Sequence, residues 1–188
     1  MIAAVDEGST TRITDRPTGA VATGLTAKGL EVRLVEYDGD RDVETPSEYD
    51  EYPAGPRVMP PGLGRFLVEL VDAAGASAVA GQVTWHLEFY GPNAGSRAWN
   101  IGIGLAPASR GHGVGTVAQR LLAEWLLATT DVDRIEASTD VANVAEQRAL
   151  EKAGFTREGV LRSAQERLDG RHDLYSYSLL RTDVVPTG

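Results

Sequence analysis

The sequence predicts a single mixed α/β domain, in which helices cover a mostly antiparallel central sheet. Between residues 30 and 105, several short runs alternate apolar and polar side chains or cluster β-forming residues, as strands do. From residue 113 the apolar period becomes helical, and a strand, a second helix and two further strands follow. The length of 188 residues and the hydrophobic fraction of 42% suit one domain with a sizeable core.

The first part of the chain divides into an extension, a strand and an irregular segment. Residues 1–24 are polar, rich in Thr, Gly and Asp, and lack a period, so we expect a mobile N-terminal extension. The domain then spans residues 25–185 and begins with an alternating strand at residues 30–37. Residues 38–62 hold seven acidic side chains and several prolines, which predicts an irregular segment with at most one short helix.

The remaining elements follow from hydrophobic periodicity and from the residues that interrupt it. The expected helix at residues 113–128 places Val114, Val117, Leu121, Leu122 and Trp125 on one face. A second helix is stopped by Gly154, which favours the left-handed conformation that ends helices. The full set is strands at 65–71, 78–89 and 99–105, the helix at 113–128, a strand at 134–139, the helix at 144–153, and strands around 158–162 and 174–180.

The composition disfavours several classes of function. A net charge of −9 argues against a nucleic-acid partner, because an acidic surface repels a phosphate backbone. No apolar run reaches the roughly 20 residues that cross a bilayer, and the N-terminus lacks the basic start and apolar stretch of a secretory signal, so we expect a cytoplasmic protein without membrane contact. The absence of cysteine and the wide spacing of the three histidines argue against a metal site.

A glycine-rich stretch between a strand and a helix is the most informative part of the sequence. Residues 101–116 end a strand, turn at a proline and open a helix with closely spaced glycines. Gly113 and Gly115 let a ligand approach the backbone, whose N–H groups and helix dipole favour an anion such as phosphate. Arg110 adds a fixed positive charge, and residues 97–123 contain no acidic side chain although the chain is acidic overall. The stretch therefore predicts an anion site.

The spacing of the glycines narrows the choice of anion. A Walker loop needs a lysine after its last glycine, and a dinucleotide loop needs Gly-x-Gly-x-x-Gly; neither pattern is present here. The pattern Arg110-x-x-Gly113-x-Gly115 instead resembles the pyrophosphate loop of the GNAT acetyltransferases, which holds coenzyme A.

A second motif extends the resemblance. Asn143 leads a helix that ends in Glu151-Lys152-Ala153-Gly154-Phe155, which is similar to the second GNAT signature. Residues 157–162 and 170–173 resemble the branch that acetylates ribosomal-protein N-termini and related amines. The likeness covers roughly residues 30–182.

The family resemblance implies a co-substrate, a reaction and a set of contacts. It implies direct transfer of an acetyl group from acetyl-CoA to a primary amine in a ternary complex, without a metal, in a sheet splayed between its fourth and fifth strands. The acceptor would be a small-molecule amine or a protein N-terminus, and the enzyme a monomer or homodimer. The implied cofactor contacts are the pantetheine at Ile103, Gly104 and Leu105, the pyrophosphate at Arg110, Gly111, His112, Gly113, Val114, Gly115 and Thr116, and the cofactor arm at Asn143.

The catalytic residues depart from the family pattern. Many relatives place a glutamate base where this chain has Asn100, and a tyrosine acid where it has Leu150. Glu146 is a candidate proton donor or relay, although Asn143-x-x-Glu146 is also a capping box in which Glu146 would bond the cap N–H. Ser138 ends the strand beside the expected splay and is a further candidate, with ordinary strand packing as the alternative.

Other interpretations stay open at this point. Asn100 and Leu150 are compatible with a catalytically silent acyl-CoA-binding sensor, and a longer donor such as succinyl-CoA is a second alternative. The aromatic residues Trp85, Trp99 and Tyr90 either line an acceptor pocket or pack on the sheet. The acidic segment at residues 38–62 is either a solvated loop or an electrostatic funnel for a cationic amine.

Overall fold

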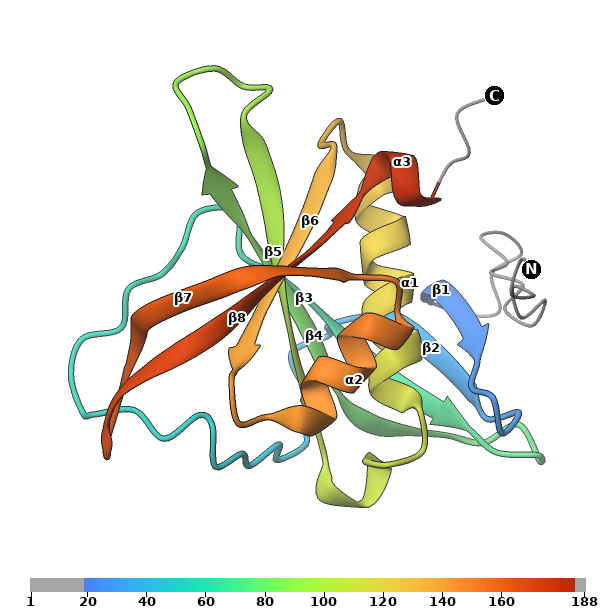
Figure 1. The fold of residues 1–188 in the computed structure, drawn as a ribbon. Coiled ribbons are helices and arrows are strands. Elements are labelled where there is room, and N and C mark those ends of the chain that lie inside the picture. Colours follow the sequence, from blue (N-terminus) through green and yellow to red (C-terminus); the bar gives the residue numbers. More distant parts are fainter. Residues whose placement is uncertain (1–18, 185–188) are drawn as a thin grey trace, which may run out of the picture.

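An eight-stranded sheet organises the chain, and the computed structural model describes residues 19–184 of it (Figure 1). Its strands lie in the order β1-β2-β3-β4-β5-β6-β8-β7. They are β1 (Ala20–Leu25), β2 (Glu31–Glu36), β3 (Gly64–Val71), β4 (Ser77–Phe89), β5 (Arg97–Leu105), β6 (Arg134–Asp140), β7 (Thr156–Arg167) and β8 (Gly170–Leu180). The helices are the short 3₁₀ turn η1 (Pro107–Ser109), then α1 (Val114–Thr129), α2 (Val144–Lys152) and α3 (Arg181–Val184).

The sheet is antiparallel except at one junction. Strands β5 and β6 run parallel and pair only from Trp99 opposite Ile135 to Ile101 opposite Ala137. Beyond Ile101, β5 continues to Leu105 beside β4, while β6 continues to Asp140 beside β8, so the two strands diverge. This divergence is the predicted splay; it lies between the fifth and sixth strands because the sequence analysis missed β1. The mixed α/β domain and its mostly antiparallel sheet are confirmed.

Helices α1 and α2 pack side by side on one face of the sheet (Figure 1). The buried face of α1 includes Val114, Leu121, Leu122 and Leu126, all within the main core. In the same core, the ring of Trp85 lies 4.7 Å from that of Phe66 and 5.5 Å from that of Trp125. Trp85 therefore packs between the sheet and α1, which agrees with the alternative in which it packs on the sheet.

The N-terminal boundary of the domain differs from the prediction. Residues 20–24, which were assigned to a mobile extension, belong to β1 and pair with β2. The small, Thr- and Gly-containing strand lacks a strong apolar pattern, but its glycine permits close packing: a Cβ at Gly24 would lie 3.0 Å from Cγ1 of Val117 on α1. Residues 1–18 of the expected extension and residue 185 fall outside the described residues.

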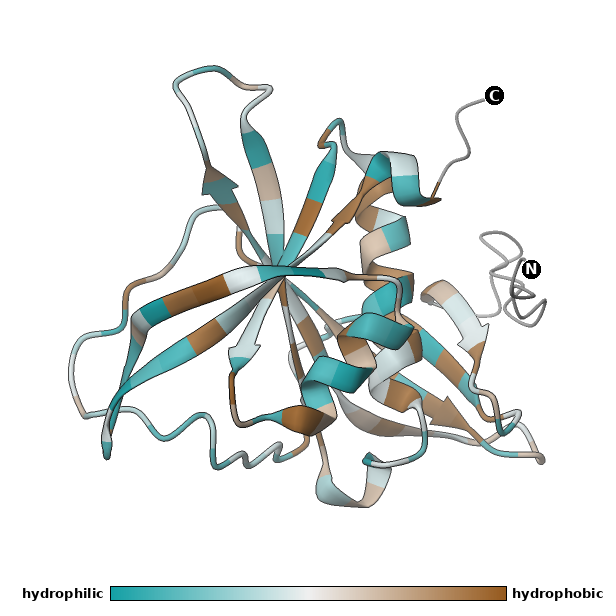
Figure 2. Ribbon diagram, viewed as in Figure 1, coloured by the Kyte–Doolittle hydropathy of each residue, from teal (hydrophilic) through white to brown (hydrophobic). Residues whose placement is uncertain are grey.

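Residues 38–62 form an irregular segment without a helix, as the prolines and acidic residues indicated. Figure 1 shows this segment, in light blue to teal, passing the tip of the β7–β8 hairpin, and Figure 2 shows that it is largely hydrophilic. The backbone N–H of Leu168 in that tip donates to the carbonyl of Glu51 at 3.0 Å. Among residues 19–184, no helix is long and apolar enough to cross a membrane.

Candidate functional site

The predicted cofactor loop connects the C-terminal end of β5 to the first turn of α1. Gly111 and Gly113 adopt positive φ angles of 73° and 81°, which other residues rarely tolerate. Gly113 is the N-cap of α1 and provides no side-chain capping bond, and the first turn of the helix contains no acidic residue. Residues 111–113 are exposed, whereas Val114 turns into the core. The N-terminal N–H groups of α1 thus suit an anion, as a pyrophosphate loop requires.

The Arg110 guanidinium is hydrogen-bonded to backbone carbonyls. Its Nε donates to the carbonyl of Leu105 at 3.0 Å, and its Nη2 donates to the same carbonyl and to that of Pro46. The guanidinium therefore fastens the irregular segment to the end of β5, beside the glycine loop. This contact joins residues 64 positions apart, and no local sequence signal marks it.

The predicted pantetheine strand has one free edge. Ile103, Gly104 and Leu105 pair with β4 on one side. On the other side β6 has diverged, and of these residues only Leu105 has its carbonyl engaged by Arg110. Gly104 is approached by the irregular segment, because a Cβ at that position would lie 2.7 Å from Oγ1 of Thr45. The free edge and the adjacent glycine loop fit the extended arm and the pyrophosphate of coenzyme A. Val114 and Thr116 are part of the first turn of α1, whereas His112 is an exposed loop residue.

Asn143 caps α2, and its Oδ1 accepts a hydrogen bond from the N–H of Glu146 at 3.2 Å. The second bond expected in the capping box, from the N–H of Asn143 to the Glu146 carboxylate, is wrong. The N–H of Asn143 instead donates to the carbonyl of Asp140 at 2.9 Å. The tight turn after β6 supplies that partner locally. The carboxylate of Glu146 is therefore not used by the cap.

The Glu146 carboxylate instead lies between the two helices. Burial raises its pKa to about 7 from an ordinary value of 4.5, and a hydrogen bond from the Gln119 side chain opposes this shift in part. Gln119 is almost fully buried on α1, and its Nε2 donates to the carbonyl of Gly115 at 3.1 Å. Glu146 and the cofactor loop are thus connected through Gln119, a residue that the sequence analysis did not select. A carboxyl group with a pKa near neutrality suits proton transfer.

The other two catalytic candidates face away from α1. Ile101 and Trp85 turn into the α1 core, so Asn100 and its neighbours of the same parity point to the opposite face. Ser138 is exposed on β6 at the first position beyond the β5–β6 pairing, opposite Ser176 of β8. Asn100 and Ser138 therefore share one face of the diverging strands, while Glu146 lies on the helical side.

A buried ion pair lies at the C-terminal end of β6. The carboxylate of Asp140 is 3% exposed and lies 2.8 Å from the guanidinium of Arg167 and 2.9 Å from Nδ1 of His172. The N–H of Ala142 also donates to it at 2.7 Å, and these bonds hold its pKa below the ordinary value despite its burial. His172 bonds Asp169 as well, which raises the pKa of His172. His172 and Arg167 thus have a structural role, because both hold the buried Asp140 carboxylate.

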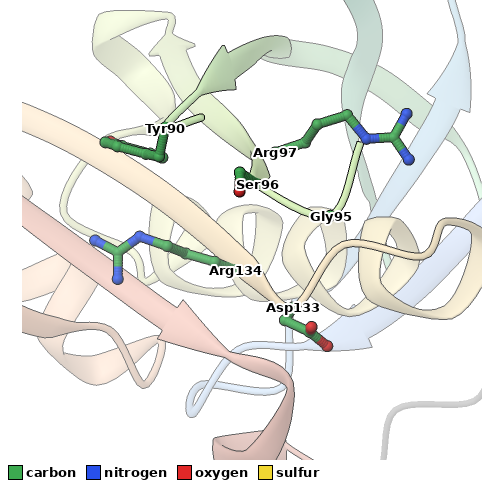
Figure 3. Close-up of a pocket in the computed structure, with 6 residues that line it drawn as sticks. All are labelled: Tyr90, Gly95, Ser96, Arg97, Asp133 and Arg134. Atoms are coloured by element: carbon green, nitrogen blue, oxygen red, sulfur yellow. The ribbon is translucent and has the colours of Figure 1, made fainter. Parts of the chain in front are cut away.

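The cavity in Figure 3 lies at the other end of the sheet. It has a volume of about 340 Å³ and is lined by Tyr90, Gly95, Ser96, Arg97, Asp133 and Arg134. The side chains of Arg97 and Arg134 point in opposite directions, and the lining includes no residue of the glycine loop. This cavity is therefore separate from the predicted cofactor site. Among residues 19–184, no group of three or more potential ligands is arranged for a metal ion.

The fold and these two motifs define an acyltransferase of the GNAT type. The family model described as acetyltransferase (GNAT) domain matches residues 34–156, and the chain therefore belongs to this family. Its members transfer an acyl group from acyl-CoA to an amine.

One curated relative supports this assignment over a limited stretch. The probable N-acetyltransferase YjcK of Bacillus subtilis (strain 168) is 40% identical over 62 residues, which are 33% of this chain and 34% of that protein. The matched part thus spans about a third of the relative.

Solved structures share the fold. Mycobacterium smegmatis RimJ in complex with CoA-disulfide superposes with a TM-score of 0.56 and 22% identity, over 67% of this chain and 56% of that chain. A chimera of spermidine N-acetyltransferase SpeG from Vibrio cholerae and hSSAT gives 0.54 and 22%, over 64% of this chain and 68% of the other. At these identities the likeness establishes the fold alone.

Proposed function

We propose that this chain transfers an acetyl group from acetyl-CoA to a primary amine by direct attack within a ternary complex. The observation that supports it most strongly is the combination of an uncapped, acid-free helix N-terminus at Gly113 with the free edge of β5 beyond Ile101. Together these features offer a phosphate site and an extended backbone partner side by side, which suits a cofactor with a diphosphate and a long amide-bearing arm. The acceptor is a small-molecule amine or a protein N-terminus.

Each part of the site has a role in this reaction. Residues 110–116 would hold the pyrophosphate, Ile103 to Leu105 the pantetheine, and Asn143 the arm of the cofactor. Acetyl-CoA supplies the activated thioester, and the amine nitrogen attacks its carbonyl carbon as the C–S bond breaks. Backbone N–H groups on the free edge of β5 are available to stabilise the developing oxyanion.

Glu146 is proposed as the group that protonates the departing thiolate. Its raised pKa, about 7, keeps a substantial protonated fraction near neutral pH. Its link through Gln119 to Gly115 supports a role beside the proposed cofactor loop. We expect Glu146→Gln to lower kcat by roughly 10²-fold while acetyl-CoA affinity stays unchanged, because Gln keeps the size but cannot release a proton. Steady-state kinetics and calorimetry on the folded variant measure both quantities. An unchanged kcat would assign the carboxylate no catalytic part.

A silent acyl-CoA-binding module is the second candidate, favoured by one observation. The position of the usual tyrosine acid is occupied by Leu150, whose apolar side chain is fully buried in the core and has no proton to donate.

One screen separates these candidates. Free thiol is measured with acetyl-CoA or succinyl-CoA in the presence of spermidine, glucosamine or a peptide with a free N-terminus, and CoA binding is measured in parallel. The proposed function predicts amine-dependent thiol release with acetyl-CoA. Tight CoA binding without thiol release from any amine would identify the silent module, and turnover with succinyl-CoA alone would identify the longer donor.

A further inference from the structure

The base position of this acyltransferase holds a residue that cannot accept a proton. Asn100 lies on β5 in the middle of the three residues that pair with β6, between Trp99 and Ile101, just before the strands diverge. Its neighbours across the sheet are His86 on β4 and Glu136 on β6, each directly opposite Asn100 in the strand register. Directly opposed residues project from the same face of a sheet. Two titratable side chains therefore flank Asn100 in one row.

This row faces the side of the sheet from which Ser138 is accessible. The intervening residues Trp85 and Ile101 point into the core beneath α1, so His86 and Asn100 point to the opposite face. The next row along the strands contains Thr84, Gly102 and Ser138, where β5 and β6 separate. A group in the row of His86 therefore lies one step, about 7 Å along the strand, from the point of divergence.

Glu136 is poorly placed to exchange protons. Its carboxylate is 5% exposed, accepts a hydrogen bond from the Tyr90 hydroxyl at 2.7 Å, and is paired with Arg134. Arg134 also pairs with Glu158, whose carboxylate accepts a bond from Ser178. The bond to Glu136, together with burial, raises the pKa of Tyr90 to about 12, so this phenol stays protonated. Glu136 is thus fully engaged in an ion network.

His86 has a simpler and more open environment. Its Nε2 lies 3.2 Å from Oε1 of Glu88, two residues along the same strand, and its side chain is 29% exposed. When Nε2–H donates to Glu88, the lone pair of the neutral imidazole is on Nδ1. Among the residues that the structure describes, no hydrogen bond occupies Nδ1. A carboxylate-oriented imidazole with a free acceptor nitrogen is a common form of general base.

We propose that His86, oriented by Glu88, accepts the proton from the attacking amine in place of the carboxylate that Asn100 replaces. This assignment rests on the proposed function. Nδ1 takes the proton of the amine nitrogen, directly or through one water, as the N–C bond to the acetyl carbon forms, and the proton then passes to solvent. Glu88 stabilises the imidazolium during this step, and Asn100 is left to position the amine or the relaying water.

The charged groups around His86 set the expected pH dependence. Glu88 on its own strand is the nearest charge, while Glu136 beyond Asn100 is balanced by Arg134. The basic form of His86 should therefore be required for turnover, so kcat at saturating substrates should fall as the imidazole is protonated at low pH.

The test compares kcat–pH profiles for the amine with the highest rate in the screen above. His86→Gln should lower kcat by about 10²-fold and abolish the acid limb, and imidazole added to His86→Ala should restore part of the rate. Glu88→Gln should lower kcat less than His86→Gln does, because the imidazole keeps its acceptor nitrogen and loses only the carboxylate that orients it. Glu31→Gln is the matched control, since Glu31 pairs with Arg33 two residues along strand β2, and it should leave the profile unchanged.

Two further measurements separate the possible outcomes. A second amine of different pKa should show the same acid limb, because a limb that moves with the amine reports the substrate instead of the enzyme. An unchanged kcat and pH profile in folded His86→Gln overturns the assignment, as does loss of the limb in Glu136→Gln alone. Failure of the wild-type chain to acetylate any amine would instead refute the proposed function.

Discussion

The two sides of the diverging strands are built in different ways. The proposed cofactor side consists of two continuous stretches, residues 101–116 and 143–155, whose backbone conformation and helix termini would create the contacts. The proposed acceptor side is assembled from separate parts of the chain: His86 on β4, Asn100 on β5, Ser138 on β6 and the irregular segment at residues 38–62. A cofactor site made of backbone groups tolerates substitution of its side chains. An acceptor site made of side chains changes its shape and charge with each substitution.

The acceptor side also depends on long-range tethers. Arg110 ties Pro46 to the end of β5, while the Tyr52 hydroxyl accepts a hydrogen bond from Nε2 of Gln165 at 2.9 Å. The Arg167 guanidinium stacks over the Tyr49 ring at 5.7 Å and pairs with buried Asp140. The irregular segment is thus held at both the cofactor loop and the β7–β8 hairpin.

The largest effect should follow from breaking the buried ion pair on the acceptor side. Arg167→Met leaves the Asp140 carboxylate buried with only His172 and a backbone N–H, which should cost about 3 kcal/mol of unfolding free energy. The amine KM should rise because the hairpin tether is weakened, while acetyl-CoA affinity in the folded variant should stay unchanged. Denaturant titration and calorimetry measure these effects. Equal losses of amine and cofactor binding would show that the two sides are not separable.

The contrast between the two sides explains which parts of the fold and of the site could be predicted from the sequence. The glycine turn before α1 and the helix α2 were located because glycine spacing and an asparagine cap are local signals, and periodicity located most strands to within a few residues. β1 was not predicted because its small residues have no strong apolar pattern. The strand is stabilised by packing against α1, where Gly24 lies close to Val117. The pairing of Asp140 with Arg167, and of Asn100 with His86, depends on strand register, which one sequence does not specify.

The next effect concerns the stability cost of Glu146. Its folded-state pKa of about 7 lies above the ordinary 4.5, so the folded protein binds more protons than the unfolded chain between these values. Stability should therefore fall as pH rises through this range, and the full cost should be present above pH 7. Glu146→Gln should then be more stable than wild type by on the order of 2 kcal/mol at pH 8, with little difference at pH 4. Denaturant titrations at both pH values test this, and a pH-independent difference would contradict the raised pKa.

The glycine loop should give an effect of about tenfold on the cofactor side. Gly113 has a φ angle of 81°, so Gly113→Ala strains the N-cap of α1 and should weaken acetyl-CoA binding at least tenfold, about 1.4 kcal/mol. Gly75 provides the matched control, because it also has a positive φ angle, 85°, lies outside the glycine loop between β3 and β4, and has no atom within 4 Å of an added Cβ. Calorimetry should show that Gly75→Ala keeps its affinity. Unchanged affinity in folded Gly113→Ala would remove this loop from the cofactor site.

The smallest effect distinguishes paired from unpaired acids in the irregular segment. Asp38 pairs with Arg41, which holds its pKa at about 2, and Asp42 lies 3.9 Å from Arg65, so their charges are partly balanced. Glu44 precedes Thr45, which lies beside Gly104, and Glu48 precedes Tyr49, whose hydroxyl donates to the carbonyl of Ala142. Neither glutamate forms an ion pair within residues 19–184.

If this segment attracts a cationic amine, the Glu44→Gln/Glu48→Gln double variant should raise the amine KM by roughly two- to threefold at low ionic strength. The difference from wild type should vanish near 0.5 M salt, where exposed charges are screened within about 4 Å. The control is Asp38→Asn/Asp42→Asn, which removes the same formal charge from balanced positions and should change KM less. Equal effects of the two double variants would mean that only net charge acts on the amine. No effect of either, with an unchanged salt slope, would identify the segment as a solvated loop and leave amine recognition to the row of His86 and Asn100.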